Sequence, residues 1–149
     1  MRNHRYQNYF DEEVLAASPL KLIQMLYGAV LDSIAAARRH VRQKNISART
    51  RSINKAIGLV TELSGCLNHE ADILLCRNLA GLYGYVVRLL IEANVKQTES
   101  PLAEAEALLS PLAEAWKACA PPVPDRDVPN GELLLQETSI GGSADLSLR

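Results

Sequence analysis

Aromatic residues are scarce in this 149-residue chain: they make up 5% of it and include one Trp and one Phe. A core must therefore be built mostly from Leu, Ile, Val and Ala, which suits packed helices better than a β-sandwich. Apolar residues make up 48% and charged residues 22%, both ordinary for a soluble globular protein. The length is sufficient for one domain with its own core.

Long apolar runs are also missing, so we expect no membrane-spanning segment. Residues 1–6 are polar and basic and lack the apolar stretch of a signal peptide. The three cysteines are odd in number and irregularly spaced, which does not indicate a disulfide framework. Together these absences favour a cytoplasmic protein, in a compartment where thiols stay reduced.

The residue patterns of catalytic and cofactor sites are absent too. The three histidines are scattered, and the chain has neither a phosphate-binding loop nor a dinucleotide glycine pattern. Cys66, His69 and Cys76 are the only candidates for a metal site, but they lack the paired short loops of zinc sites. We therefore predict that the chain is not an enzyme and holds no cofactor or metal.

What is present is helical periodicity. Apolar residues recur every three or four positions in four segments. These predict helices at about residues 19–43, 48–67 and 71–94, and a fourth helix that begins at about residue 100. Ser18-Pro19 and Ser100-Pro101 are typical helix starts, because Ser caps free N–H groups and Pro suits the first turn. The sequence predicts an all-α antiparallel four-helix bundle.

The domain organisation follows from composition. Residues 18–119 form the predicted bundle, and residues 1–17 are a polar N-terminal lead. Residues 120–149 are rich in Pro and Gly and are predicted to be a flexible C-terminal tail. In the fourth helix, Pro111 predicts a kink or a restart capped by Ser110. Trp116 shares the apolar stripe of this helix and is expected to pack in the core.

The third helix is the most apolar of the four. At about 100° per residue, its apolar side chains cover roughly 240° of the helix surface, so it must be covered on nearly all sides. Either the other three helices cover it, or part of its surface is left for a partner. The candidates for the exposed part are Tyr83, Val87 and Ile91 on one side and Leu74 and Tyr85 on the other.

A run of cations between residues 38 and 55 raises the question of nucleic-acid binding. No aromatic residue interleaves with these cations to stack on bases, and the calculated pI of 6.3 is far from basic. Cations are also favoured at a helix C-terminus by the helix dipole. A solvated end of the bundle is the preferred interpretation.

Three ordered blocks resemble the flagellar secretion chaperone FliS family. The first runs from Tyr9 through Ala17-Ser18-Pro19 to Met25-Leu26-Tyr27-Gly28. The second lies in the third helix and includes Leu82-Tyr83-Gly84-Tyr85, Arg88-Leu89 and Glu92-Ala93-Asn94, with Gly84 where the family usually has Asp. The third is Leu112 with Ala115-Trp116-Lys117. The resemblance covers roughly residues 6–118 and leaves the tail outside.

The resemblance implies a four-helix export chaperone that binds the C-terminal segment of flagellin, prevents its premature polymerisation and delivers it to the flagellar export gate. It adds Tyr9, Tyr27 and Asn94 to the five partner-binding candidates of the third helix. We further expect the lead to cover the binding groove when flagellin is absent, since an exposed apolar groove invites aggregation. The rival interpretations are a bundle that only forms a homodimer and, less favoured, one that binds nucleic acid.

Overall fold

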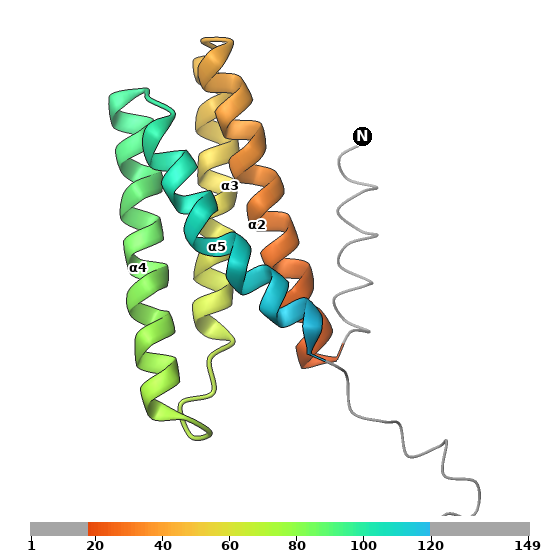
Figure 1. Cartoon of the computed structure of the whole chain (residues 1–149). Helices are drawn as coiled ribbons and strands as arrows, with labels where there is room; N and C mark the ends of the chain where they lie inside the picture. Colours follow the sequence, from red (N-terminus) through yellow and green to blue (C-terminus); the bar gives the residue numbers. More distant parts are fainter. Residues whose placement is uncertain (1–17, 120–149) are drawn as a thin grey trace, which may run out of the picture. The chain divides into compact units, whose positions relative to one another are not determined.

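The computed structural model describes residues 18–119, and these form four α-helices. They are α2 (Pro19–Arg42), α3 (Ile46–Gly65), α4 (Ile73–Lys96) and α5 (Ser100–Ala118). Consecutive helices run in opposite directions, and each packs mainly on two others, so that α2 and α4 each contact α3 and α5 (Figure 1). The predicted all-α four-helix bundle is confirmed. The predictions for residues 1–17 and 120–149 lie outside the described residues.

Side-chain caps fix the starts of the first three helices. Ser18, Asn45 and Asp72 each accept the backbone N–H of the residue three positions later, at 3.0–3.2 Å. Lys44 and Gln97 lie in the turns after α2 and α4 and adopt left-handed backbone conformations, with φ of 58° and 57°. These caps and turns place each helix boundary within about two residues of its predicted position.

The fourth predicted helix differs from expectation in two details. Ser100 is the first residue of α5 rather than its cap, and the preceding Glu99 makes no capping hydrogen bond. The helix then continues unbroken through Pro111, so the predicted restart at Ser110 is wrong (Figure 1). Pro111 and Ala107 are both exposed, so water can reach the carbonyl that the missing N–H leaves without a partner.

All four helices contribute to one continuous core. The largest side chains with less than 2% exposure are Tyr27, Ile34, Ile53, Leu63, Leu90, Leu102 and Leu109. Trp116 packs against this core but stays partly exposed, so the expectation that it is a core residue holds only for part of its ring. Its uncovered part faces the pocket described below.

Two of the helices are long and apolar enough to cross a membrane by length and composition alone. They are α2 and α4, each with a mean hydropathy of 1.3 over the relevant window, of which a third is buried inside the bundle. Core helices of bundles meet the same criteria, because they too must be apolar over much of their surface. The packing of α2 and α4 against α3 and α5 accounts for their composition.

Candidate partner-binding site

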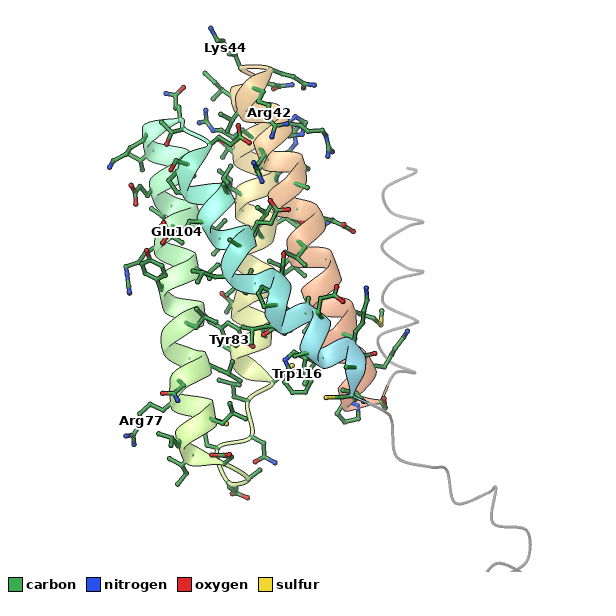
Figure 2. All side chains as sticks on the ribbon, in the orientation of Figure 1. Arg42, Lys44, Arg77, Tyr83, Glu104 and Trp116 are labelled. Atoms are coloured by element: carbon green, nitrogen blue, oxygen red, sulfur yellow. The ribbon has the colours of Figure 1, made fainter. Side chains whose placement is uncertain are left out.

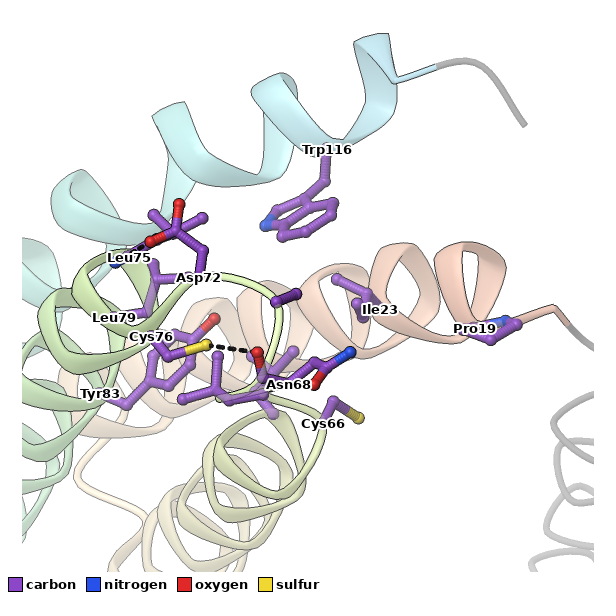
Figure 3. A pocket seen from close by; sticks show the side chains of 13 residues that line it. Pro19, Ile23, Cys66, Asn68, Asp72, Leu75, Cys76, Leu79, Tyr83 and Trp116 are labelled. Carbon is purple, nitrogen blue, oxygen red and sulfur yellow. Dashed lines mark hydrogen bonds between the residues drawn. The ribbon is translucent and has the colours of Figure 1, made fainter. Parts of the chain in front are cut away.

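An apolar pocket of about 290 Å³ opens at the end of the bundle where α2 begins and α5 ends (Figure 3). We call it the end pocket. Its walls come from all four helices and from the connection between α3 and α4. The lining residues are Pro19, Ile23, Leu63, Cys66, Leu67, Asn68, Ala71, Asp72, Leu75, Cys76, Leu79, Tyr83 and Trp116. Most are apolar, so the pocket suits an apolar side chain rather than a charged ligand.

The end pocket exists because α5 diverges from α4 at this end of the bundle. In Figure 1 the last turns of α5 lie over the start of α2, while α4 begins on the other side. Gln24 holds the end of α5 there by donating a hydrogen bond from Nε2 to the carbonyl oxygen of Trp116, at 2.8 Å. The Trp116 ring therefore forms one wall of the end pocket instead of filling the core.

A hydrogen bond joins two of the residues that line the end pocket. The thiol of Cys76 donates to the carbonyl oxygen of Asn68 at 3.2 Å, which ties α4 to the connection before it. Burial raises the pKa of the Cys66 thiol, so it stays protonated at neutral pH. Within residues 18–119 no three His, Cys, Asp or Glu side chains gather in a way that could hold a metal ion. The sulfur atoms here belong to an apolar wall.

Tyr27 and Tyr83 were expected at the partner surface, but both are buried, with 1% and 2% of their surface exposed. Their hydroxyl groups share a hydrogen bond of 2.7 Å across the core, and their rings pack at a centroid distance of 6.4 Å. Burial raises the pKa of both hydroxyls, so both remain protonated across the physiological range. The expectation that Tyr83 is exposed is wrong.

The error has a geometric cause. The buried side of α4 is centred near Leu79, Tyr83 and Leu90, whereas the sequence pattern had placed Leu75 on the buried side and Tyr83 beside it. That rotation of the helix moves Leu75 outward and Tyr83 inward. Tyr83 still contributes to the inner wall of the end pocket.

The outward side of α4 carries the other predicted residues. Leu74, Ile91 and Tyr85 are 66%, 49% and 37% exposed, which confirms their predicted exposure, and Val87 is half-buried against the core. The sequence reasoning missed Ile73, Leu75 and Val95, which are also exposed. The apolar cover of α4 by the other helices is therefore incomplete at both of its ends.

Two predicted partner residues already have partners inside the bundle. The Tyr85 hydroxyl donates to the Glu104 carboxylate on α5, and the Arg88 guanidinium lies 5.7 Å from the centre of the Tyr85 ring. Asn94 is half-buried, and its Oδ1 accepts hydrogen bonds from Arg49 Nε at 3.1 Å and from Thr50 at 3.2 Å. Asn94 thus joins α4 to α3. Tyr9, the remaining candidate, lies outside the described residues.

The basic run at the opposite end of the bundle is partly neutralised. Arg38 and Arg42 bind Glu99 at 2.6 Å and 2.5 Å, and Arg38 also binds Glu106. The guanidinium groups of Arg42 and Arg38 lower the pKa of Glu99 to about 2. Arg49 is buried against Asn94. Three of the cations therefore join helices, which weakens the nucleic-acid interpretation of this end.

An all-α bundle with an apolar pocket at one end and an incompletely covered helix defines a class: a protein that binds other proteins by burial of apolar surface. Comparison with known proteins narrows this class. A family model described as "Flagellar protein FliS" matches residues 1–123. The chain therefore belongs to the FliS family of flagellar secretion chaperones.

Relatives from several bacteria are named flagellar secretion chaperones. The chain is 34% identical to a flagellar secretion chaperone of Salmonella typhimurium over 112 residues, which span 74% of the chain and 83% of the relative. It is 30% identical to one of Bacillus subtilis over 112 residues, or 75% and 83% of the two chains. It is also 30% identical to one of Campylobacter jejuni over 134 residues, or 90% and 98%.

Proposed function

We propose that this chaperone holds the C-terminal segment of flagellin in the cytoplasm, keeps it from polymerising, and delivers it to the flagellar export gate. The role is burial of a client segment rather than catalysis. The observation that carries the proposal is the end pocket and its continuation onto α4. Leu75 lines the pocket and is also 49% exposed, next to the exposed Ile73 and Leu74.

The size of the end pocket limits what it contributes. Burial of one Leu-sized side chain gives about 1.5–3 kcal/mol. A segment that folds on binding loses about 2–5 kcal/mol or more in ordering. The end pocket alone therefore cannot hold a disordered segment. About 1,000 Å² of buried apolar area gives roughly 25 kcal/mol before the costs of association, so the client must extend over a second surface.

The end pocket is also the place that the N-terminal lead is proposed to cover before the client binds. Pro19 lines the pocket, so the chain enters the bundle beside it. An apolar residue of the lead, such as Tyr9 or Phe10, would fit a pocket of this chemistry. Tyr9→Ala should then leave the fold intact and strengthen client binding, because a competitor for the pocket is removed. If Tyr9 also contacts the client, the same substitution should weaken binding. An unchanged affinity together with unchanged dye binding contradicts both roles.

The proposed function is tested by titrating a flagellin C-terminal peptide into the full-length chain while recording calorimetry and the emission of Trp116. This residue is the only tryptophan and lines the end pocket. We expect binding, with a blue shift as the client excludes water from the ring. Leu75→Glu should weaken binding by about tenfold or more.

A matched control separates this effect from a general loss of apolar surface. Ile46 is 57% exposed at the start of α3, at the opposite end of the bundle. Ile46→Glu should bind the peptide as the wild type does. Absence of binding by the wild type contradicts the proposal, and equal loss in both variants contradicts the role of the end pocket.

Self-association is the second candidate function, and the exposed apolar residues of α4 favour it. Ile91 and Val95 are exposed near the end of α4. A homodimer would cover them in a second copy of the chain. Light scattering with and without the flagellin peptide distinguishes the two functions. A mass of two chains that the peptide does not change would favour self-association alone.

A further inference from the structure

The outward side of α4 is a second surface, which begins beside the end pocket at Leu74 and continues along the helix away from it. It carries exposed apolar side chains at both ends, with Leu74 near the start and Ile91 and Val95 near the finish. Between these ends Ala80 and Gly81 are exposed and Gly84 is half-exposed. At 100° per residue these positions share one side of the helix. A helix of 24 residues is about 36 Å long, which is room for a client helix of several turns.

The small residues leave a shallow notch in the middle of this surface. A Cβ at Gly81 would meet no atom of the chain within 4 Å, and one at Gly84 would meet only the end of the Arg88 side chain at 4.0 Å. Nothing in the bundle thus requires glycine here, although glycine inside a helix is unfavourable relative to alanine. Ala80 and Gly84 are one turn apart, the spacing that lets the backbone of a second helix approach closely.

Two cations mark the ends of the notch. Arg77 and Arg88 are exposed and take part in no ion pair within residues 18–119, and Arg77 points away from the bundle (Figure 2). They are eleven residues apart, so they lie on the same side of α4 and about 16 Å apart along its axis. The nearby Glu92 is already bound by Lys96 at 3.1 Å. The carboxylate of Glu104 likewise accepts the Tyr85 hydroxyl, so the two arginines are the charged groups beside the notch that have no ion-pair partner within residues 18–119.

We propose that this surface binds an acidic amphipathic helix of the client, packed against α4 over the notch. The apolar side chains of this helix would pack against Leu74 and Ile91, and its backbone would approach α4 closely at Gly81 and Gly84. Two of its carboxylates, about three turns apart, would pair with the two arginines. This inference rests on the proposed function and supplies the second surface that the energetics of the end pocket require. Charge complementarity selects an acidic helix over a basic one.

The test fills the notch without disturbing the bundle. Gly84→Leu and Gly81→Leu place a side chain in open space and exchange a poor helix former for a good one, so both variants should fold. We expect each to weaken binding of purified flagellin monomer about tenfold or more. The matched control is Gly58→Leu. Gly58 is also exposed with nothing within 4 Å, but it lies on a polar side of α3.

A charge reversal tests the surface independently of the notch. The double substitution Arg77→Glu and Arg88→Glu should also weaken flagellin binding about tenfold and reduce its dependence on salt. The control Lys55→Glu removes an exposed cation of α3 and should bind normally.

Three outcomes are distinguishable. Weakened binding in the notch and arginine variants, with both controls normal, supports the proposal. Normal binding in those variants overturns it and leaves the proposed function standing. No binding by the wild type overturns both. Circular dichroism confirms in each case that the variant is folded.

Discussion

Removal of one hydroxyl from the buried tyrosine pair should destabilise the bundle more than removal of both. Tyr83→Phe leaves the Tyr27 hydroxyl buried, with 1% of the residue exposed and its 2.7 Å partner gone. An unsatisfied buried hydroxyl costs about 1–3 kcal/mol. The melting temperature should fall by about 4–8 °C for each kcal/mol in a domain of about 100 residues.

The double variant Tyr27→Phe/Tyr83→Phe should recover much of this loss, because neither ring then carries a polar group without a partner. Thermal and urea unfolding of the two single variants and the double variant, followed by far-ultraviolet circular dichroism, gives the coupling energy directly. We expect a coupling of about 1 kcal/mol or more. A double variant whose loss equals the sum of the single losses would refute the hydrogen bond as a stabilising contact.

The same pair predicts a dependence on pH. Burial raises the pKa of both hydroxyls in the folded state above the ordinary value of 10.0. Folding therefore favours their neutral form, so their contribution to stability is complete below pH 10 and declines as the pH rises above it. The double variant should lack this decline, whereas the wild type should show it.

The stability of the wild type should fall as the pH drops from about 4.5 toward 2, because Arg42 and Arg38 hold the pKa of Glu99 at about 2. Glu99→Gln should lack this acid-dependent part of the stability when melting is followed as a function of pH. The emission of Trp116 should lie between buried and solvated values and shift red on unfolding, and emission typical of water in the native protein would count against its packing. Gly81→Ala should raise the free energy of unfolding by about 1 kcal/mol in urea, and a loss would show that the site is not open.

Much of the fold follows from local sequence. The capping residues and the 3.6-residue periodicity were sufficient to place four helices and the start at Ser18. The exposure of side chains on α4 was harder to predict. When a helix is apolar over most of its surface, the sequence pattern does not indicate which side faces the core. Leu74 and Ile91 were placed correctly, whereas Tyr83 was not.

The end pocket could not be predicted, since it depends on the angle at which α5 crosses the bundle. That angle is set by tertiary contacts such as the hydrogen bond from Gln24 to the end of α5. The role of Asn94 was missed for a similar reason. Its partner Arg49 is 45 positions away along the chain, and periodicity within one helix carries no information about such a pair. The predicted restart at Ser110 was wrong because a proline inside a helix is tolerated where the carbonyl without a partner is reached by water, and the sequence does not show whether that side of the helix is solvated.

We propose that this chaperone recognises the C-terminal segment of flagellin by burying it. The most direct measurement is calorimetric titration of the full-length chain with two flagellin monomers, one intact and one lacking its C-terminal segment. We expect binding of intact flagellin with a negative heat-capacity change, the mark of apolar burial, and no binding of the shortened form. Equal binding of both forms, or of neither, would contradict it.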